Sequence, residues 1–183
     1  RGLGDVYKRQ VLGRARTLKI RKLEKGEDFH GIYDALKSYA EISDNDIIVV
    51  ENECPDYAYF GELNTMLSIR SGASATIVGG VTRDRDNVMK MNYPVFSKGY
   101  NCKDVRKRAT LANFNRTINV LGVTISPSDL IFADNDGVVV IPVAYENKIM
   151  KAIIEKIGME NNVASEIARY SNPLDIVEKI GEF

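Results

Sequence analysis

The chain has 183 residues, of which 44% are hydrophobic and 27% are charged, a composition typical of a globular protein of one domain. Lysine plus arginine and aspartate plus glutamate both number 25, so nothing in the charge balance favours nucleic acid or an anionic membrane as a partner. No apolar stretch reaches the roughly 20 residues of a membrane-spanning helix, and without a signal-peptide pattern the expected location is the cytoplasm.

The chain begins with RGLGDVYKRQ, which has neither an initiator methionine nor a clear amphipathic period. Residues 1–10 are therefore expected to be a non-native or truncated start, and residues 11–183 a single domain. Short runs rich in Val, Ile and Phe, bounded by Gly, Pro, Asn or Asp, predict strands in its centre. The expected strands are 11–22, 46–52, 75–80, 93–99, 117–125, 129–133 and 137–142.

Helical spacing of apolar residues predicts helices before, between and after these strands. The expected helices are 29–40, 61–72, 145–158, 161–170 and 172–180, with Asn172 as N-cap of the last. The sequence Asn135-Asp136-Gly137 predicts a hairpin turn, because these residues tolerate positive φ. The expected fold class is α/β, with helices flanking a strand-rich centre and C-terminal helices from about residue 145.

Ligands for soft metals are scarce, since Cys54, Cys102 and His30 are the only cysteines and histidine in the chain. The cysteines form no CxxC motif, which argues against a structural zinc site. Any metal is expected to be a hard, oxygen-liganded ion such as Mg²⁺ or Mn²⁺. His30 is expected to cap or pack near its helix.

A glycine stands directly before the helix expected at 61–72, in the sequence YFGELNT. The first N–H groups of a helix have no internal partners, and the helix dipole favours an anion there. The amides of Gly61, Glu62, Leu63 and Asn64 are therefore candidates for binding a substrate carboxylate. A plain loop-to-helix junction, with Glu62 satisfying the dipole, is the simpler alternative.

The sequence GGVTRDRD follows the run 75–78. Arg83 suits bidentate recognition of a carboxylate, and Asp84 supplies a hard oxygen for a divalent cation. Asp86 is a rival ligand, and Arg85 is expected to face solvent. The alternative is a solvated charged turn without a ligand.

Two other charged stretches are interpreted as structural. Asp134 and Asp136 lack the remaining positions of a calcium loop and fit the hairpin better. The sequence KDVRKRAT at 103–110 is the one basic cluster, and although it is able to contact phosphate, zero net charge favours a surface or subunit contact.

Taken in order, these stretches resemble the regulator of ribonuclease E activity A family, which includes metal-dependent 4-hydroxy-4-methyl-2-oxoglutarate aldolases. The similar stretches are GRARTL (13–18), HGIYDAL (30–36), DIIVVEN (46–52), FGELNTMLSIRSGA (60–73), TIVGGVTRD (76–84), YPVFSKG (93–99) and INVLGVTISPSDLIFADNDGVVVIP (118–142). The resemblance implies a layered β/β/α swivelling-type domain that assembles as a homotrimer or hexamer, with sites near subunit interfaces.

The resemblance also implies roles for the candidate residues. The amides of residues 61–64 would hold a pyruvyl carboxylate, Arg83 would contact the substrate, and Asp84 would hold Mg²⁺ or Mn²⁺. The implied function is a divalent-metal-dependent aldolase or decarboxylase that cleaves a small 2-oxo acid, such as 4-hydroxy-4-methyl-2-oxoglutarate or oxaloacetate, to pyruvate through a metal-stabilised enolate. The alternative is a non-catalytic regulator that binds ribonuclease E or another protein.

The chain departs from the family pattern at several positions, which leaves the substrate open. Gly79 stands where many members have Asp, and Asn64 and Thr65 replace small apolar residues. An acidic residue contributed by a neighbouring subunit is typical of the family, and the candidates are Glu155, Glu160 and Glu166.

Overall fold

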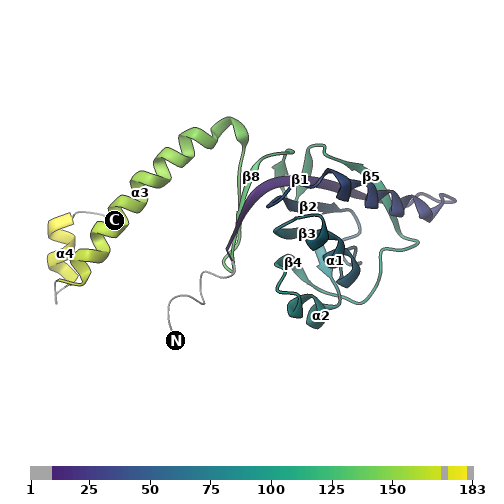
Figure 1. Cartoon of the computed structure of the whole chain (residues 1–183), viewed down its shortest axis with the longest axis horizontal. Coiled ribbons are helices and arrows are strands. Elements are labelled where there is room, and N and C mark those ends of the chain that lie inside the picture. Colours follow the sequence, from purple (N-terminus) through teal and green to yellow (C-terminus); the bar gives the residue numbers. More distant parts are fainter. Residues whose placement is uncertain (1–9, 170–172, 181–183) are drawn as a thin grey trace. The chain divides into compact units, whose positions relative to one another are not determined.

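The computed structural model describes residues 10–169 and 173–180. The chain divides into two units, Arg1–Val143 and Ala144–Phe183. Figure 1 shows strands and short helices in the first unit and helices in the second. No helix in the described part of the chain is both long enough and apolar enough to cross a membrane.

The first unit is built on a seven-stranded mixed sheet whose central strand is β1 (Figure 1). On one side of β1 the strands run parallel in the order β2, β3, β4. On the other side β8 and β5 each pair antiparallel with β1, and β9 pairs antiparallel with β8. The strand bounds are β1 Val11–Lys22, β2 Ile47–Asn52, β3 Ala75–Thr82, β4 Val95–Tyr100, β5 Ala109–Phe114, β8 Leu130–Ala133 and β9 Val138–Ile141. A separate hairpin joins β6 (Ile118–Val120) to β7 (Val123–Ile125).

Both faces of β2 are buried, which explains why its residues 47–50 form a continuous apolar run. Ile48 and Val50 belong to the core on one face, together with Phe60 and residues of the helix η3 (Phe29–Glu41). Ile47 and Val49 belong to the core on the other face, which the β6–β7 hairpin covers.

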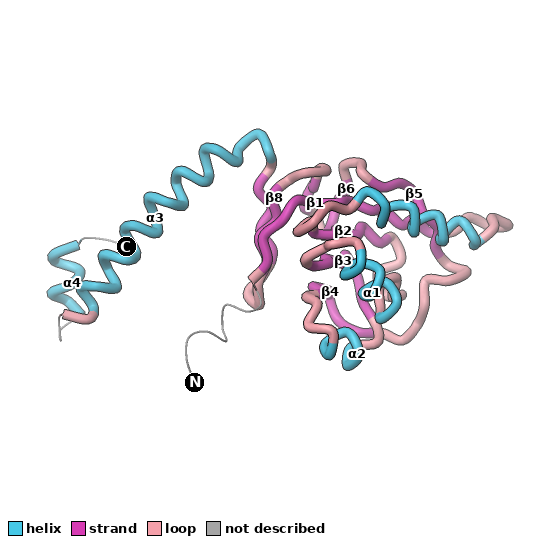
Figure 2. Tube along the Cα trace, in the orientation of Figure 1, coloured by secondary structure: helices cyan, strands magenta, loops and turns pink. Residues whose placement is uncertain are grey.

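The helices of the first unit are short. They are η3, which packs against β5, and α1 (Glu62–Arg70) and α2 (Arg85–Lys90), which contact each other. Figure 2 shows α1 and α2 as helical turns within long loops beside β3 and β4. This places the starts of both helices near the ends of buried strands.

The second unit contains α3 (Glu146–Ile167) and α4 (Pro173–Ile180), which contact each other, after the short helix η4 (Val143–Tyr145) at the boundary. Val163, Glu166 and Ile176 are buried, whereas most side chains of α3 are exposed.

The predicted α/β class with a strand-rich sheet and flanking helices is confirmed, and the differences lie in individual elements. Residues 29–41 form a 3₁₀ helix, and the strand expected at 117–125 is a hairpin that turns at Leu121 and Gly122, both with positive φ. The helices expected at 145–158 and 161–170 form one helix, α3. The expected N-cap Asn172 lies outside the described residues.

Candidate functional site

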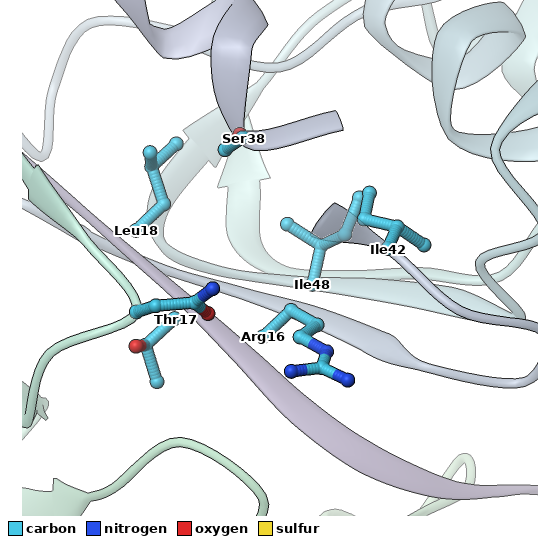
Figure 3. A pocket seen from close by; sticks show the side chains of 7 residues that line it. Arg16, Thr17, Leu18, Ser38, Ile42 and Ile48 are labelled. Carbon is cyan, nitrogen blue, oxygen red and sulfur yellow. The ribbon is translucent and has the colours of Figure 1, made fainter. Parts of the chain in front are cut away.

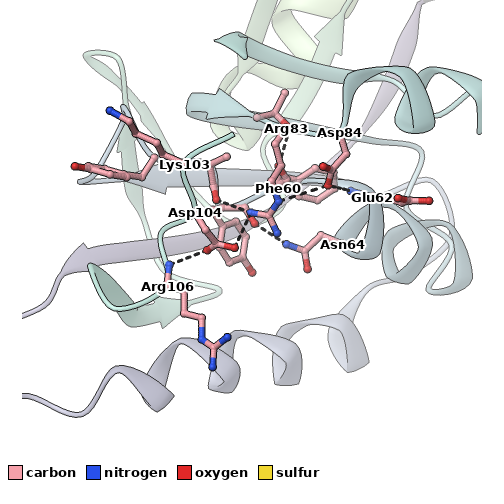
Figure 4. A network of polar contacts seen from close by, with 12 residues as sticks. Phe60, Glu62, Asn64, Arg83, Asp84, Lys103, Asp104 and Arg106 are labelled. Atoms are coloured by element: carbon pink, nitrogen blue, oxygen red, sulfur yellow. Dashed lines mark hydrogen bonds and ion pairs between the residues drawn. The ribbon is translucent and has the colours of Figure 1, made fainter. Parts of the chain in front are cut away.

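The end of strand β3 lies beside the segment that enters helix α1, and this contact builds the candidate site (Figure 4). Thr82 and Phe60 form a parallel β-bridge. The Thr82 hydroxyl donates to the Phe60 carbonyl at 2.8 Å, and the Arg83 amide donates to the same carbonyl at 3.1 Å. The two stretches singled out in the sequence therefore meet, although 22 residues separate Glu62 from Asp84.

Two glycines allow this close approach. A Cβ at Gly61 would lie 2.5 Å from Asp84 Oδ2 and 2.8 Å from Arg83 Cγ. A Cβ at Gly80 would lie 2.8 Å from the carbonyl oxygen of Pro55, which accepts a hydrogen bond from the Val81 amide at 2.9 Å. Any larger residue at position 61 would push the Arg-Asp pair away from the start of α1.

The Asp84 carboxylate is fixed against the first turn of α1. Its Oδ2 accepts the backbone N–H of Glu62 at 3.0 Å and lies 3.4 Å from Arg83 Nε. Asp84 has φ 58° and ψ 35°, in the left-handed region that Asp and Asn tolerate better than most residues. With a side chain 38% exposed, the carboxylate is held in place yet open to solvent.

The N-terminus of α1 keeps free donors beside this carboxylate. Gly61 is the N-cap and offers no capping side chain. The Glu62 amide is taken by Asp84, so the uncapped donors of the first turn are the amides of Leu63 and Asn64. The sequence proposed the amides of Gly61, Glu62, Leu63 and Asn64 for an anion, and of these four the Glu62 amide is already engaged by Asp84.

The Arg83 guanidinium is anchored on one nitrogen. Nη1 donates to the carbonyl of Ala58 at 2.9 Å and lies 3.1 Å from Asp104 Oδ2. Figure 4 shows the guanidinium between the two acidic residues, Asp84 and Asp104. Nη2 donates no hydrogen bond within the described residues, so it is the nitrogen that is available to a ligand.

Oxygen ligands for a metal are few. No group of three or more His, Cys, Asp or Glu side chains with metal-binding geometry occurs within residues 10–169 and 173–180. The candidate site holds three carboxylates. Asp104 is paired with Arg83, Oδ1 of Asp84 has no hydrogen bond within the described residues, and Oε2 of Glu62 accepts from Asn87 Nδ2 at 2.8 Å. This donor set fits Mg²⁺ or Mn²⁺, because such ions keep several waters and need only one or two carboxylates.

The other sequence candidates lie outside this network. Asp86 is exposed in the first turn of α2, and Arg85 is exposed as expected, with its guanidinium 5.4 Å from the centroid of the Tyr100 ring. His30 is exposed and bonds through Nδ1 to Asp28 Oδ1 at 2.6 Å. Asp134 Oδ1 accepts the amides of Asp136 and Gly137, as expected for a structural hairpin.

The three acidic candidates of the C-terminal helix belong to the second unit. Glu155 and Glu160 are exposed on α3, and Glu166 is buried and paired with Arg169 at 3.3 Å. Their expected contribution to a neighbouring subunit's site stays a prediction.

Sequence reasoning missed Asp104 and Asn87, which hold Arg83 and Glu62 in place. Asn87 follows Asp84 by one helical turn, which is a usable local signal. Asp104 is 20 positions beyond Asp84, inside a stretch that reads as basic, and only the fold brings it to Arg83.

A small pocket elsewhere in the first unit is not a rival site (Figure 3). Its volume of about 10 Å³ is enough for about one water molecule, which is too little for a 2-oxo acid. The residues that line it are Arg16, Thr17, Leu18, Ser38, Ile42, Ile48 and Asn115.

Comparison with known proteins places the chain in a family. The family model RraA-like (Aldolase/RraA) matches residues 1–140. Protein DlpA of Legionella pneumophila is 33% identical over 135 residues, which is 73% of this chain and 22% of DlpA. A protein of Halalkalibacterium halodurans named "Putative 4-hydroxy-4-methyl-2-oxoglutarate aldolase" is 31% identical over 149 residues, covering 80% of this chain and 67% of that protein.

Solved structures show the same fold at lower identity. An uncharacterized protein from Pseudomonas syringae pv. tomato superposes with a TM-score of 0.81 at 23% identity, covering 95% of this chain and 78% of that one. Streptomyces coelicolor RraAS2, described as an unusual member of the RNase ES inhibitor RraA protein family, gives 0.71 at 24% identity, covering 83% and 75%. The family model, the curated relatives and the shared fold agree, and the chain belongs to the RraA-like family.

Proposed function

We propose that this chain is a divalent-metal-dependent lyase, an aldolase or decarboxylase that cleaves a small 2-oxo acid such as 4-hydroxy-4-methyl-2-oxoglutarate or oxaloacetate to pyruvate. One observation carries the proposal: the Asp84 carboxylate lies 3.0 Å from the Glu62 amide at the start of α1, with Arg83 beside it. The name of the Halalkalibacterium relative supports the same reaction class.

Asp84 is the residue proposed to hold Mg²⁺ or Mn²⁺, through the Oδ1 oxygen that has no hydrogen bond within the described residues. Glu62 is proposed as a second carboxylate for the ion, and a hydrogen bond from Asn87 orients it. When bound, such an ion acts as a Lewis acid for the negative charge that develops on the pyruvate enolate as the C–C bond breaks.

The start of α1 is proposed to bind the substrate carboxylate. The Leu63 and Asn64 amides are uncapped, and the helix dipole adds a favourable field for an anion at this end. Asn64 is also held from its other side, since its Nδ2 donates to the Tyr59 carbonyl at 2.8 Å. A rigid first turn keeps the carboxylate in one orientation, which favours reaction over random encounter.

Arg83 is proposed to complete the binding of the 2-oxo acid through Nη2. Its Nη1 is committed to Ala58 and Asp104, so the guanidinium plane is already oriented before a ligand arrives. A fixed positive charge beside the developing enolate lowers the barrier without reorganisation during the reaction.

A non-catalytic regulator that binds ribonuclease E or another protein is the second candidate. The family contains both kinds of member. The similar structures include one described as a member of the RNase ES inhibitor RraA protein family and one described as the RNA-processing inhibitor RraA. For either function, we propose assembly as a homotrimer or hexamer, which light scattering on the purified chain tests directly.

The deciding experiment is a coupled assay for pyruvate release from both substrates, with Mg²⁺, with Mn²⁺ and with EDTA. A blank without protein is subtracted, because oxaloacetate also decarboxylates with metal alone. Asp84→Asn is expected to abolish turnover, and Asp86→Asn, which removes a carboxylate two residues away, is expected to retain it. No metal-dependent turnover on either substrate, or equal loss in both variants, contradicts the proposal and favours the regulator.

A further inference from the structure

A second concave surface of the first unit is lined by cations and shares no residue with the candidate site. This basic cleft has a volume of about 700 Å³, and it is formed by residues 22–27, Cys54, Tyr57, Lys107 and Arg108. The volume lies in the range of small-molecule sites, about 300–1,000 Å³. Its two walls are tied together by a hydrogen bond of 2.8 Å from the Leu23 amide to the Arg108 carbonyl.

Four basic and two acidic side chains line the cleft, so its lining carries a net positive charge. Lys22, Lys25, Lys107 and Arg108 line it, and none of them pairs with a carboxylate in the described ranges of the chain. Of the two acids that line it, Glu27 is engaged by Arg21 through both oxygens, at 2.6 and 2.9 Å.

Aromatic rings lie beside two of the cationic side chains, with Lys107 Nζ 5.7 Å from the centroid of the Phe29 ring. The Arg108 guanidinium stacks over the Tyr57 ring at 4.5 Å, and its Nη1 also donates to the carbonyls of Asp104 and Arg106, each at 3.5 Å. Lys107 has φ +64°, a left-handed conformation that lysine rarely adopts. The backbone at Lys107 therefore carries a conformational cost, and the property that lysine brings to this position is a positive charge.

We propose that the basic cleft binds a small compound that carries a diphosphate-like group, at a site separate from that of the 2-oxo acid. Four cationic side chains on two facing segments suit a ligand with several adjacent negative charges, because a single carboxylate would leave most of them uncompensated. Arginine and lysine are both common phosphate ligands, the first through a planar fork and the second as a point charge.

The test is calorimetric titration of the full chain with inorganic pyrophosphate in EDTA, so that no divalent ion bridges ligand and protein. The double variant Lys25→Gln with Lys107→Asn is expected to bind pyrophosphate about tenfold more weakly, since it loses two charge-assisted contacts. Because Asn tolerates positive φ, the melting temperature of this variant is expected to stay unchanged or to rise.

The matched control is Lys90→Gln with Lys98→Gln, which removes the same charge from exposed positions of the same unit outside the cleft. It is expected to retain wild-type affinity. Equal weakening by the control, or no binding to the wild type, overturns the proposal. Binding that is lost in Arg83→Gln but kept in the cleft variant assigns the anion to the candidate site and also overturns it, as does binding of poly-glutamate without binding of pyrophosphate.

Discussion

Arg83 and Asp104 form an ion pair, with 3.1 Å between Nη1 and Oδ2. The segment that carries Asp104 is itself fixed, because Ala58 and Asp104 form a parallel β-bridge and Asp104 Oδ1 accepts the Arg106 amide at 2.7 Å. The same nitrogen of Arg83 donates to the Ala58 carbonyl at 2.9 Å. Asp104 is thus a positioning residue, which acts on a substrate only through the guanidinium it orients.

Replacement of Asp104 is expected to affect activity more than stability. The Asp104 side chain is 47% exposed, and an exposed ion pair contributes at most about 1 kcal/mol to folding. A misplaced guanidinium costs about tenfold to a hundredfold in kcat/KM for pyruvate release. Asp104→Asn keeps an acceptor for Arg83 and is expected to lose less activity than Asp104→Ala. Wild-type kcat/KM in both variants would show that Arg83 needs no such support.

Two substitutions are expected to separate the effect of the Asp84 backbone conformation on stability from the effect of its carboxylate on activity. Because φ is 58°, Asp84→Ala adds a left-handed strain of about 1 kcal/mol that Asp84→Asn avoids. Both variants are expected to lose metal-dependent activity, whereas only the alanine variant is expected to unfold at lower urea concentration. Urea titrations of the three proteins check this, and equal midpoints for alanine and asparagine contradict it.

Gly61→Ala is expected to disturb the site without adding any charge. The new Cβ would lie 2.5 Å from Asp84 Oδ2, so the carboxylate must move and its hydrogen bond to the Glu62 amide must lengthen. Activity is expected to fall by about tenfold or more. Gly137→Ala is the matched control, because nothing lies within 4 Å of its Cβ position. The same assay on both variants tests the steric argument, which fails if they behave alike.

Much of the fold is predictable from the sequence because the buried strands are apolar runs. Ile47 to Val50 alternate between two cores, so every residue of the run is hydrophobic and the strand is easily recognised.

Helix α2 was not predictable, because it has six residues and one buried side chain, Val88, and is too short to show a helical period. In the hairpin at 118–125, Leu121 takes a positive φ that its side chain does not signal. Gly158 suggested a helix end, yet α3 continues because one glycine costs only about 1 kcal/mol.

The two segments of the candidate site were predictable from local sequence, but their contact was not. A glycine before a helix and an Arg-Asp pair after a strand are each contiguous motifs, so both are visible in the sequence. Their meeting depends on the register between Phe60 and Thr82, and the support from Asp104 depends on the bridge to Ala58. Both are contacts between distant segments, which no spacing in the sequence encodes.

The two cysteines are expected to differ in reactivity. Cys54 is buried, and burial raises the pKa of its thiol, whereas Cys102 is exposed. A thiol reagent such as DTNB is expected to react with one cysteine in the native protein and with both in urea, because the thiolate is the reactive form. Cys102→Ser is expected to abolish the native reaction. Two fast-reacting thiols in the native wild type would contradict the buried position of Cys54.

The ion pair between Arg21 and Glu27 predicts a loss of stability in acid. Hydrogen bonds from the Arg21 guanidinium and from the Glu24 amide lower the pKa of Glu27 from 4.5 to about 2. A depressed folded-state pKa contributes stability that is fully present above pH 4.5, and this contribution is lost as the pH falls from 4.5 towards 2.

The measurement is the difference in urea midpoint between the wild type and Glu27→Gln at several pH values. The difference is expected to be constant near neutral pH and to shrink as the pH falls below 4.5, because protonated glutamate and glutamine then resemble each other. The control is Asp34→Asn, which removes an exposed ion pair of 2.8 Å between Asp34 and Lys37. This variant is expected to have little effect on stability at any pH. If the difference in urea midpoint between wild type and Glu27→Gln grows on acidification, Arg21 does not stabilise the charged carboxylate of Glu27. The negative charge of Glu27 would then have to be counted in full among the charges of the basic cleft.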